Sequence, residues 1–347
     1  MSFEESALMT DSGTFTSPSR TVAYRAVGVD AGNRQVKVAR SGNEVAVIPS
    51  VIKHLSQRDG LPVAPSSYSI QYESGDWTGS PYLRGKRWSV GQLASDMQGS
   101  ATFKGEKADV MPELVMAALA MVVGNGVASI GELKLCLPDD EPVTCSQVRS
   151  ALKGIHHITT PDGSLTLHIK NVAIELEGIS AFKWLKSSGF YQATTRLNGI
   201  LDIGGGNSSA QIFAPSGYPI LESRKVLPGM GELARMISAT SEGLRGIEGK
   251  VCSPKLELIL DAIADGSYCY GVTGKSFKSD FDDCFPRWLE NLKTEIKNHW
   301  QQYLPQIAEI AIIGGAAPLM YPLVESSKGR FKIAPESEII TAKGMVM

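Results

Sequence analysis

The sequence lacks several features that would mark a specialised class of protein. None of its five cysteines stands in a C-x-x-C pair, which argues against a zinc site or a disulfide framework and favours free thiols. The formal net charge is only −2, so general affinity for nucleic acids or anionic membranes is not expected. The longest apolar stretch, residues 114–123, is about half as long as a membrane-spanning helix. The first 20 residues have no basic region of the kind that opens a secretory signal. These absences predict a cytoplasmic protein.

The chain is nevertheless long and apolar enough for two packed units. Its 347 residues correspond to about two domains, and 43% of them are hydrophobic. Residues 1–20 are rich in serine and threonine and are predicted to form a disordered tail. Phe3, Leu8 and Met9 would lie on one face of a short membrane-binding helix. No basic residue precedes Arg20, so a solvated tail, or one that orders on a partner, is favoured.

Strand-like and helix-like patterns alternate from residue 21 onward. Strands are predicted at 24–30, 35–40, 45–51, 132–137, 165–169, 172–176, 218–226 and 307–313. Helices are predicted at 111–123, 179–186 and 232–238, with a rough helical period from 288 to 303. Residues 56–81 read as loops with short strands, and 88–94 as a strand that runs into a helix. This alternation predicts an α/β protein.

One pattern occurs twice. Residues 27–38 and 200–212 each contain an apolar run, an aspartate, glycine, an asparagine and a second β-like run. A strand–turn–strand with an acid at its bend can hold phosphate and a metal ion. Two copies far apart in one chain predict two similar half-domains that face one nucleotide.

The first copy centres on Asp30, Gly32 and Asn33. Gly32 permits a tight turn in which backbone N–H groups approach an anion. Asp30, at the strand end, can hold Mg²⁺ through water, and Lys37 on the returning strand would neutralise phosphate charge. Taken alone, the same residues also fit an ordinary hairpin with an exposed aspartate and lysine.

The second copy is Asp202, Gly204, Gly205, Gly206 and Asn207. Three consecutive glycines cost backbone entropy that a simple turn does not require. They suit a loop whose amides hold a β- or γ-phosphate, with Asp202 as the second acid near Mg²⁺. A flexible hinge is the alternative.

Two further glycine motifs follow. Gly314-Gly315-Ala316 ends an apolar strand, and its small residues would let a base or ribose lie against the backbone, although a packing turn would look the same. Residues 228–234 match the dinucleotide fingerprint G-x-G-x-x-A but lie deep in the second half, so NAD binding is disfavoured. Gly231 and Glu232 of this segment remain candidate nucleotide-binding residues.

Two acids and two histidines stand outside these loops. Glu175 and Glu177 lie near the end of the first half, where a carboxylate could orient or deprotonate a water that attacks a γ-phosphate. The alternative is a solvated acid at a strand end. His156 and His157 adjoin no cysteine or acid with ligand spacing, so a pair in a loop is favoured over a metal site.

Taken in order, these motifs resemble those of the actin-type ATPase superfamily, which includes actin, heat-shock chaperones, sugar kinases and bacterial filament proteins. Its first phosphate loop has the form D-x-G-[ST]-x-x-x-K, as in residues 30–37, and its second the form D-[LI]-G-G-G-[ST], as in residues 202–207. Residues 314–316 resemble its adenosine motif, and 340–345 its closing segment N-A-x-G-[MLY]. The resemblance covers about residues 22–347.

Within the superfamily the chain is most similar to the ParM/StbA plasmid-partition group. Residues 88–94 resemble that group's Y-x-V-G-x-x-A, and 135–138 its L-x-L-P strand. Residues 177–181 resemble its connector P-E-S-x-P-A-G, whose glutamate assists the attacking water. The resemblance implies a catalytic role for Glu177, with Asp30 and Asp202 beside the metal.

The resemblance also implies a duplicated ribonuclease H-like, two-domain ATPase fold with an interdomain nucleotide cleft. Residues 21–190 would form the first domain, with 322–347 packing back against it, and 191–321 the second. ATP or GTP would bind with Mg²⁺ between them. Asn33 and Asn207 stand where the superfamily has a hydroxyl residue. An amide can still donate to phosphate but with a different reach, so nucleotide preference and hydrolysis rate stay open.

The function implied by the resemblance is a bacterial, cytoplasmic protein that polymerises into filaments with ATP, and whose hydrolysis of ATP drives disassembly. Plasmid segregation through a DNA-binding adaptor is the group's usual task, and no direct contact with nucleic acid is expected. A filament that controls cell shape, with the tail as its anchor, is one alternative. A kinase-type or nucleotide-binding module that does not polymerise is the second.

Overall fold

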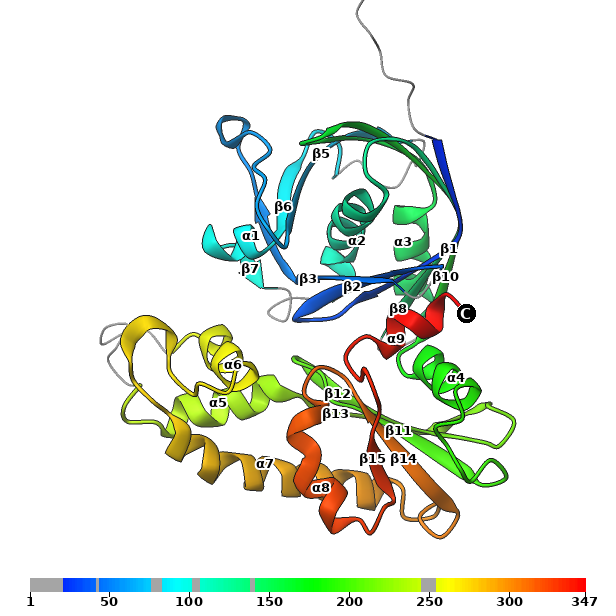
Figure 1. Ribbon diagram of the computed structural model, residues 1–347, viewed down its shortest axis with the longest axis vertical. Helices are drawn as coiled ribbons and strands as arrows, with labels where there is room; N and C mark the ends of the chain where they lie inside the picture. Colours follow the sequence, from blue (N-terminus) through cyan, green and yellow to red (C-terminus); the bar gives the residue numbers. More distant parts are fainter. Residues whose placement is uncertain (1–20, 42–43, 76–82, 102–106, 138–140, 245–253) are drawn as a thin grey trace, which may run out of the picture.

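The computed structural model describes residues 21–41, 44–75, 83–101, 107–137, 141–244 and 254–347. The predicted N-terminal tail lies outside them. The chain forms two lobes, each built on one sheet (Figure 1). None of the helices within the described residues is long and apolar enough to cross a membrane.

The first lobe contains a ten-stranded sheet in the order β3-β2-β1-β8-β10-β9-β5-β6-β4-β7. Its strands are β1 (Thr21–Ala31), β2 (Gln35–Arg40), β3 (Val45–Pro49), β4 (Val51–His54), β5 (Ser67–Gly75), β6 (Arg87–Gly91), β7 (Ser100–Ala101), β8 (Gly126–Leu137), β9 (Gly154–Thr160) and β10 (Gly163–Leu176). Its helices are α1 (Gln92–Asp96), α2 (Lys107–Val123) and α3 (Pro142–Leu152). The sheet curls around α2 (Figure 1), which explains why residues 114–120 are almost completely buried. A helix that is apolar all round needs such cover on every side.

The second lobe contains a five-stranded sheet in the order β13-β12-β11-β14-β15. Its strands are β11 (Leu197–Asp202), β12 (Asn207–Phe213), β13 (Pro219–Pro228), β14 (Ile307–Ile313) and β15 (Phe331–Ile333). The helices on one face are α5 (Met230–Thr240), α6 (Leu256–Ala264), α7 (Lys278–His299) and α8 (Tyr321–Ser326). The other face packs against α4 (Ile179–Ser187) and the start of α9 (Ile340–Met345). The two sheet faces therefore have separate cores.

The two sheets share one strand plan. In each sheet, three neighbouring strands are antiparallel, and two more strands follow that run parallel to the third. The order is β3-β2-β1-β8-β10 in the first lobe and β13-β12-β11-β14-β15 in the second. Asp30 pairs with Lys37 across the first hairpin, and Asp202 pairs with Ser209 across the second, so the two loops have equal length. The duplication predicted from the sequence is thus present strand for strand.

The C-terminal helix α9 joins the lobes. It contacts β1 and β2 of the first lobe and α4, which itself follows β10 and covers the second sheet. The crossing of α4 and α9 is very close, because a Cβ built on Gly344 would lie 2.0 Å from the backbone oxygen of Ser180. Helices α4 and α9 therefore pack between the two lobes and connect them (Figure 1).

Several local predictions were wrong. His156 and His157 lie on strand β9, not in a loop, and His156 is fully buried between the Tyr72 hydroxyl and the Leu152 carbonyl. By contrast, strand β10 includes both stretches predicted as strand, 165–169 and its continuation at 172–176. Helix α2 begins before its predicted start, so Pro112 lies inside it rather than in its first turn. For His156, the contacts with Tyr72 and Leu152, which a local pattern does not contain, decide the outcome.

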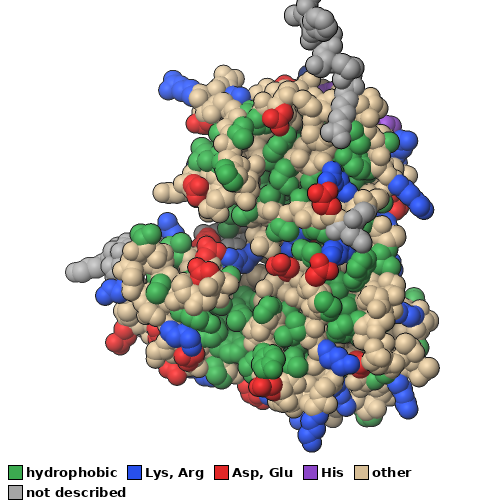
Figure 2. All heavy atoms as spheres, in the orientation of Figure 1, with side chains coloured by type: hydrophobic (Ala, Val, Ile, Leu, Met, Phe, Trp, Pro, Cys, Tyr) green, Lys and Arg blue, Asp and Glu red, His purple; other side chains and the backbone are tan. Residues whose placement is uncertain are grey.

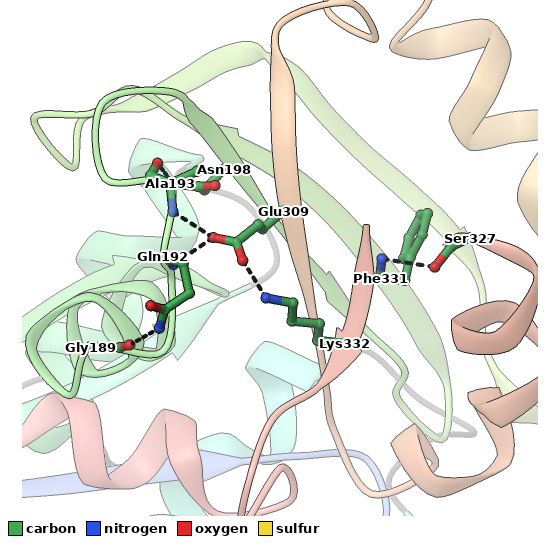
Figure 3. A network of polar contacts seen from close by, with 8 residues as sticks. All are labelled: Gly189, Gln192, Ala193, Asn198, Glu309, Ser327, Phe331 and Lys332. Atoms are coloured by element: carbon green, nitrogen blue, oxygen red, sulfur yellow. Dashed lines mark hydrogen bonds and ion pairs between the residues drawn. The ribbon is translucent and has the colours of Figure 1, made fainter. Parts of the chain in front are cut away.

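A buried carboxylate fixes the segment between α4 and β11 (Figure 3). Glu309 of β14 accepts hydrogen bonds from the backbone N–H groups of Gln192, at 2.6 Å, and Ala193, at 2.9 Å, and pairs with Lys332 of β15. Burial raises the pKa of this carboxyl, but the backbone donors and Lys332 outweigh that effect, so its pKa lies below the usual value. The charged form is therefore the one that the fold stabilises.

We predict that Glu309→Gln lowers the free energy of unfolding by about 2 kcal/mol near neutral pH, because the charge that accepts these bonds is lost. Since the folded pKa is lowered, the stabilisation is present above the unfolded-state pKa of about 4.3 and is lost as the pH falls through the folded value. Urea denaturation of both proteins across this range would show the difference shrink in acid. Glu290→Gln, at an exposed α7 residue paired with Lys293, is the control. A difference that does not change with pH would contradict the assignment.

Candidate functional site

A cavity of about 770 Å³ lies where the two lobes meet. It is lined by the β1–β2 loop, the β11–β12 loop, α5, α6, the segment after β14 and the start of α9. Charged side chains of both signs gather along this boundary between the lobes (Figure 2). The volume falls within the range of about 300–1,000 Å³ that is typical of small-molecule sites.

The first loop brings an acid and a base to the cavity. The Nζ of Lys37 lies 3.4 Å from the Oδ2 of Asp30, and their side chains are only 10% and 14% exposed. The Ser50 hydroxyl donates to the carbonyl of Gly32 and holds the turn from the side of β4. The antiparallel register of the hairpin is what places Asp30 and Lys37 opposite each other.

The two loops need glycine for the same steric reason. A Cβ on Gly32 would lie 2.8 Å from the carbonyl oxygen of Gln35, and one on Gly204 would lie 2.3 Å from that of Asn207. Both glycines follow their aspartate by two residues and face the carbonyl three residues on. In this register Asn33 corresponds to Gly205 rather than to Asn207, so the two asparagines are not at equivalent positions.

The segment that resembles a dinucleotide fingerprint supports the second loop. The N–H of Met230 donates to the carbonyl of Gly204 at 3.0 Å, and that of Gly231 donates to Gly205 at 2.7 Å. A Cβ on Gly229 would lie 2.5 Å from the carbonyl oxygen of Gly206. Gly229 and Gly231, the first two glycines of the fingerprint, therefore allow α5 to pack on the β11–β12 loop.

The loops of the two lobes touch each other. A Cβ on Gly206 would lie 2.3 Å from the Nδ2 of Asn33, and one on Gly205 would lie 2.5 Å from the Cγ of Arg34. The guanidinium of Arg34 then reaches the second lobe and pairs with Asp261 of α6. Side chains of the first loop thus fill the space that the missing side chains of the second leave.

Glu177 lies at the crossing between the lobes. Its N–H donates to the carbonyl of Leu137 in the first lobe at 3.0 Å, and its carbonyl accepts from Arg224 in the second at 3.0 Å. Gly178, with φ of +92°, turns the chain from β10 into α4. This turn leaves Glu177 among the residues that line the cavity.

The neighbouring acid has a different environment. Glu175 accepts from the Ser180 hydroxyl and from Lys183, each at 2.8 Å. Burial raises the pKa of Glu175, but Lys183 and Ser180 outweigh it, so the pKa lies below the usual value. Of the two acids that the sequence singles out, only Glu177 lines the cavity.

All but one of the predicted site residues line this single cavity. They are Asp30, Gly32, Asn33, Lys37, Glu177, Asp202, Gly204, Gly205, Gly206, Asn207, Gly231, Gly314, Gly315 and Ala316. Glu232 does not line it; its carboxylate pairs with Arg235, which does. The β14 turn is fixed by a close approach, because a Cβ on Gly314 would lie 2.5 Å from the Oδ1 of Asp202.

Sequence reasoning missed the rest of the lining. These residues are Arg34, Gln35, Ile203, Ser209, Met230, Arg235, Leu260, Ile263, Ala264, Pro318, Leu319, Glu338 and Thr341. Helix α6 was not predicted, although Ile259, Leu260, Ala262 and Ile263 have the spacing of a buried helix face. That spacing in the sequence could have predicted helix α6.

The lining fits a nucleotide with Mg²⁺. The two loops supply glycine backbone that a Cβ would obstruct, while α5, α6 and the segment after β14 supply mostly apolar residues. Within the described residues, no three His, Cys, Asp or Glu side chains cluster closely enough to hold a metal ion directly. Mg²⁺ that is bound by phosphates and waters needs only one or two nearby carboxylates, which Asp30 and Asp202 provide.

No protein-family model and no curated protein matches the chain, but solved structures do. The archaeal actin homologue Ta0583 is 14% identical, with a TM-score of 0.71 over 92% of this chain and 97% of its own. The apo ParM protein of pSK41 is 16% identical, with a TM-score of 0.63 over 93% and 95%. A ParM from Clostridium botulinum, in a 15-stranded filament, is 16% identical, with a TM-score of 0.68 over 93% and 98%. Ta0583 in complex with ADP is also similar. The predicted actin-like fold is confirmed.

We predict that Gly204→Ala lowers the free energy of unfolding by about 1–3 kcal/mol, because its Cβ has no room beside the Asn207 carbonyl. Gly315→Ala is the matched control, since a Cβ there meets nothing within 4 Å although the residue lines the same cavity. Urea denaturation should separate the two variants. Equal stability of both would show that the close approach at Gly204 does not constrain the loop.

Proposed function

We propose that the cavity binds a nucleoside triphosphate, ATP or GTP, with Mg²⁺. The observation that carries the proposal is that two equivalent hairpin loops, one from each lobe, meet at a single cavity, each with an aspartate at its base and a sterically required glycine. Backbone N–H groups of such loops bind phosphate. Ta0583, whose fold is similar, forms a complex with ADP, which supports nucleotide binding by this fold.

The remaining lining would hold the other parts of the nucleotide. Gly314, Gly315 and Ala316 offer a surface without large side chains, and Leu260, Ile263 and Leu319 offer apolar cover for a base and ribose. Asp30 and Asp202 would hold Mg²⁺ through water, and the ion would neutralise phosphate charge. Lys37 adds a cation beside Asp30.

Glu177 is the residue that we assign to hydrolysis. It lines the cavity from the crossing between the lobes, while Glu175 is engaged with Ser180 and Lys183. A carboxylate in that place orients the attacking water or accepts its proton. The N–H of Glu177 donates to the Leu137 carbonyl, and its carbonyl accepts from the Arg224 side chain. Glu177 is thereby held to both lobes, so its position depends on how the lobes are arranged.

Self-association into filaments is the second part of the proposal. ParM of Clostridium botulinum, a protein of similar fold, forms a 15-stranded filament. Assembly with the triphosphate and disassembly after hydrolysis would then form one cycle. The cellular task that we favour is segregation of plasmid DNA through a DNA-binding adaptor, in the bacterial cytoplasm.

Assembly can be tested directly. The protein is mixed with Mg-ATP, Mg-ADP or a non-hydrolysable ATP analogue, then pelleted and imaged by negative-stain electron microscopy. Filaments with ATP or the analogue support the proposal. Nucleotide binding without filaments under any condition would favour a module of the same fold that does not polymerise.

Imaging of the tagged protein in cells separates the two possible tasks of a filament. Spindles between plasmid foci support segregation. Cortical cables in cells that contain no plasmid would overturn it in favour of a role in cell shape.

We predict that Glu177→Ala assembles with ATP but releases phosphate about 100-fold more slowly, because the water is no longer oriented, and therefore disassembles slowly. Phosphate release and light scattering measure the two effects. Glu175→Gln, which changes the neighbouring acid outside the cavity, should hydrolyse at the wild-type rate. Equal turnover of Glu177→Ala and wild type would remove Glu177 from the mechanism.

A further inference from the structure

One ion pair joins a residue that lines the cavity to a residue of the opposite lobe. Among the described residues that line it, three are cationic: Arg34, Lys37 and Arg235. Lys37 pairs with Asp30 in its own hairpin, and Arg235 pairs with Glu232 in its own helix. Arg34 instead pairs with Asp261, so its partner belongs to the opposite lobe. Of these three cations, Arg34 is therefore the one whose ion pair depends on how the two lobes are arranged.

The stem of Arg34 covers the loop that is proposed to hold phosphate. A Cβ on Gly205 would lie 2.5 Å from the Cγ and 2.9 Å from the Cδ of Arg34. A phosphate bound by this loop would bring a strong acceptor close to the Arg34 guanidinium.

Asp261 is a partner that Arg34 can leave. The side chains of Arg34 and Asp261 are 31% and 60% exposed, and ion pairs with that exposure contribute little to stability. Asp261 also has acidic neighbours one helical turn away on either side, Glu257 and Asp265. Burial, with help from these two acids, raises the pKa of Asp261, and Arg34 opposes the rise.

We propose that Arg34 exchanges Asp261 for the terminal phosphate of the bound nucleoside triphosphate and thereby distinguishes triphosphate from diphosphate. This inference rests on the proposed nucleotide site. A guanidinium can bind phosphate through two parallel hydrogen bonds. A terminal phosphate also carries more negative charge than the single exposed carboxylate of Asp261. The diphosphate lacks the group that Arg34 would bind.

The exchange also couples the nucleotide to the lobes. In the structure described here the Arg34–Asp261 pair ties the first loop to α6 of the second lobe. Binding of triphosphate removes that tie, and by linkage the tie weakens triphosphate binding by the same factor. Removal of Asp261 should therefore strengthen the binding of triphosphate.

The test is a set of binding constants by calorimetry, with Mg²⁺ and either a non-hydrolysable ATP analogue or ADP, at protein concentrations below assembly. Arg34→Ala should weaken binding of the analogue about 10-fold or more while it changes ADP binding much less. Arg34→Lys should recover only part of the loss, because it cannot bind with two parallel bonds. Asp261→Asn should strengthen binding of the analogue by about 2–5-fold.

Asp282→Asn is the matched control. Asp282 is similarly exposed, at 56%, and pairs with Lys278 on α7, outside the cavity. It should leave both binding constants unchanged. Circular dichroism confirms that each variant is folded, and Asp261→Asn tests the inference even if Arg34→Ala does not fold.

The outcomes separate the inference from the proposed function. If the wild-type protein binds neither nucleotide, the proposed function fails and the inference fails with it. If the wild type binds both, but Arg34→Ala weakens both equally or Asp261→Asn weakens the analogue, the inference alone is overturned.

Discussion

The contact between the two hairpin loops is the constraint on which the rest of the site depends. Asn33 and Arg34 of the first loop lie against Gly206 and Gly205 of the second, so closely that a Cβ on either glycine would collide with them. The second loop is fixed in turn from behind, where the carbonyls of Gly204 and Gly205 accept bonds from the start of α5. The two loops belong to different lobes, so their contact is one of the places where the lobes meet. A ligand that enters between the loops would therefore contact both lobes at once.

Much of this arrangement could be predicted from the sequence because it is local. A buried strand, an acid, glycine and a returning strand are adjacent in the chain, and the predicted bounds of β2 match the structure. The steric need for Gly32 and Gly204 arises within three residues, so a repeated pattern was enough to reveal it. The same holds for Glu177, whose position follows from the end of a strand and a glycine turn into a helix.

Contacts between distant segments could not be predicted in this way. The pair of Arg34 and Asp261 joins residues 227 positions apart, and only the packing of α6 beside the first loop brings them together. His156 looked like part of a loop because its partners, Tyr72 and Leu152, are supplied by the packed sheet and by α3.

The central claim is that the two loops bind the phosphates of one nucleotide together. Hydrogen exchange of their backbone amides, with and without Mg²⁺ and a non-hydrolysable ATP analogue, tests it most directly. The account predicts that residues 32–34 and 204–207 become protected together on addition of the analogue. Protection of one loop alone, or nucleotide binding that leaves both loops unchanged, would contradict it.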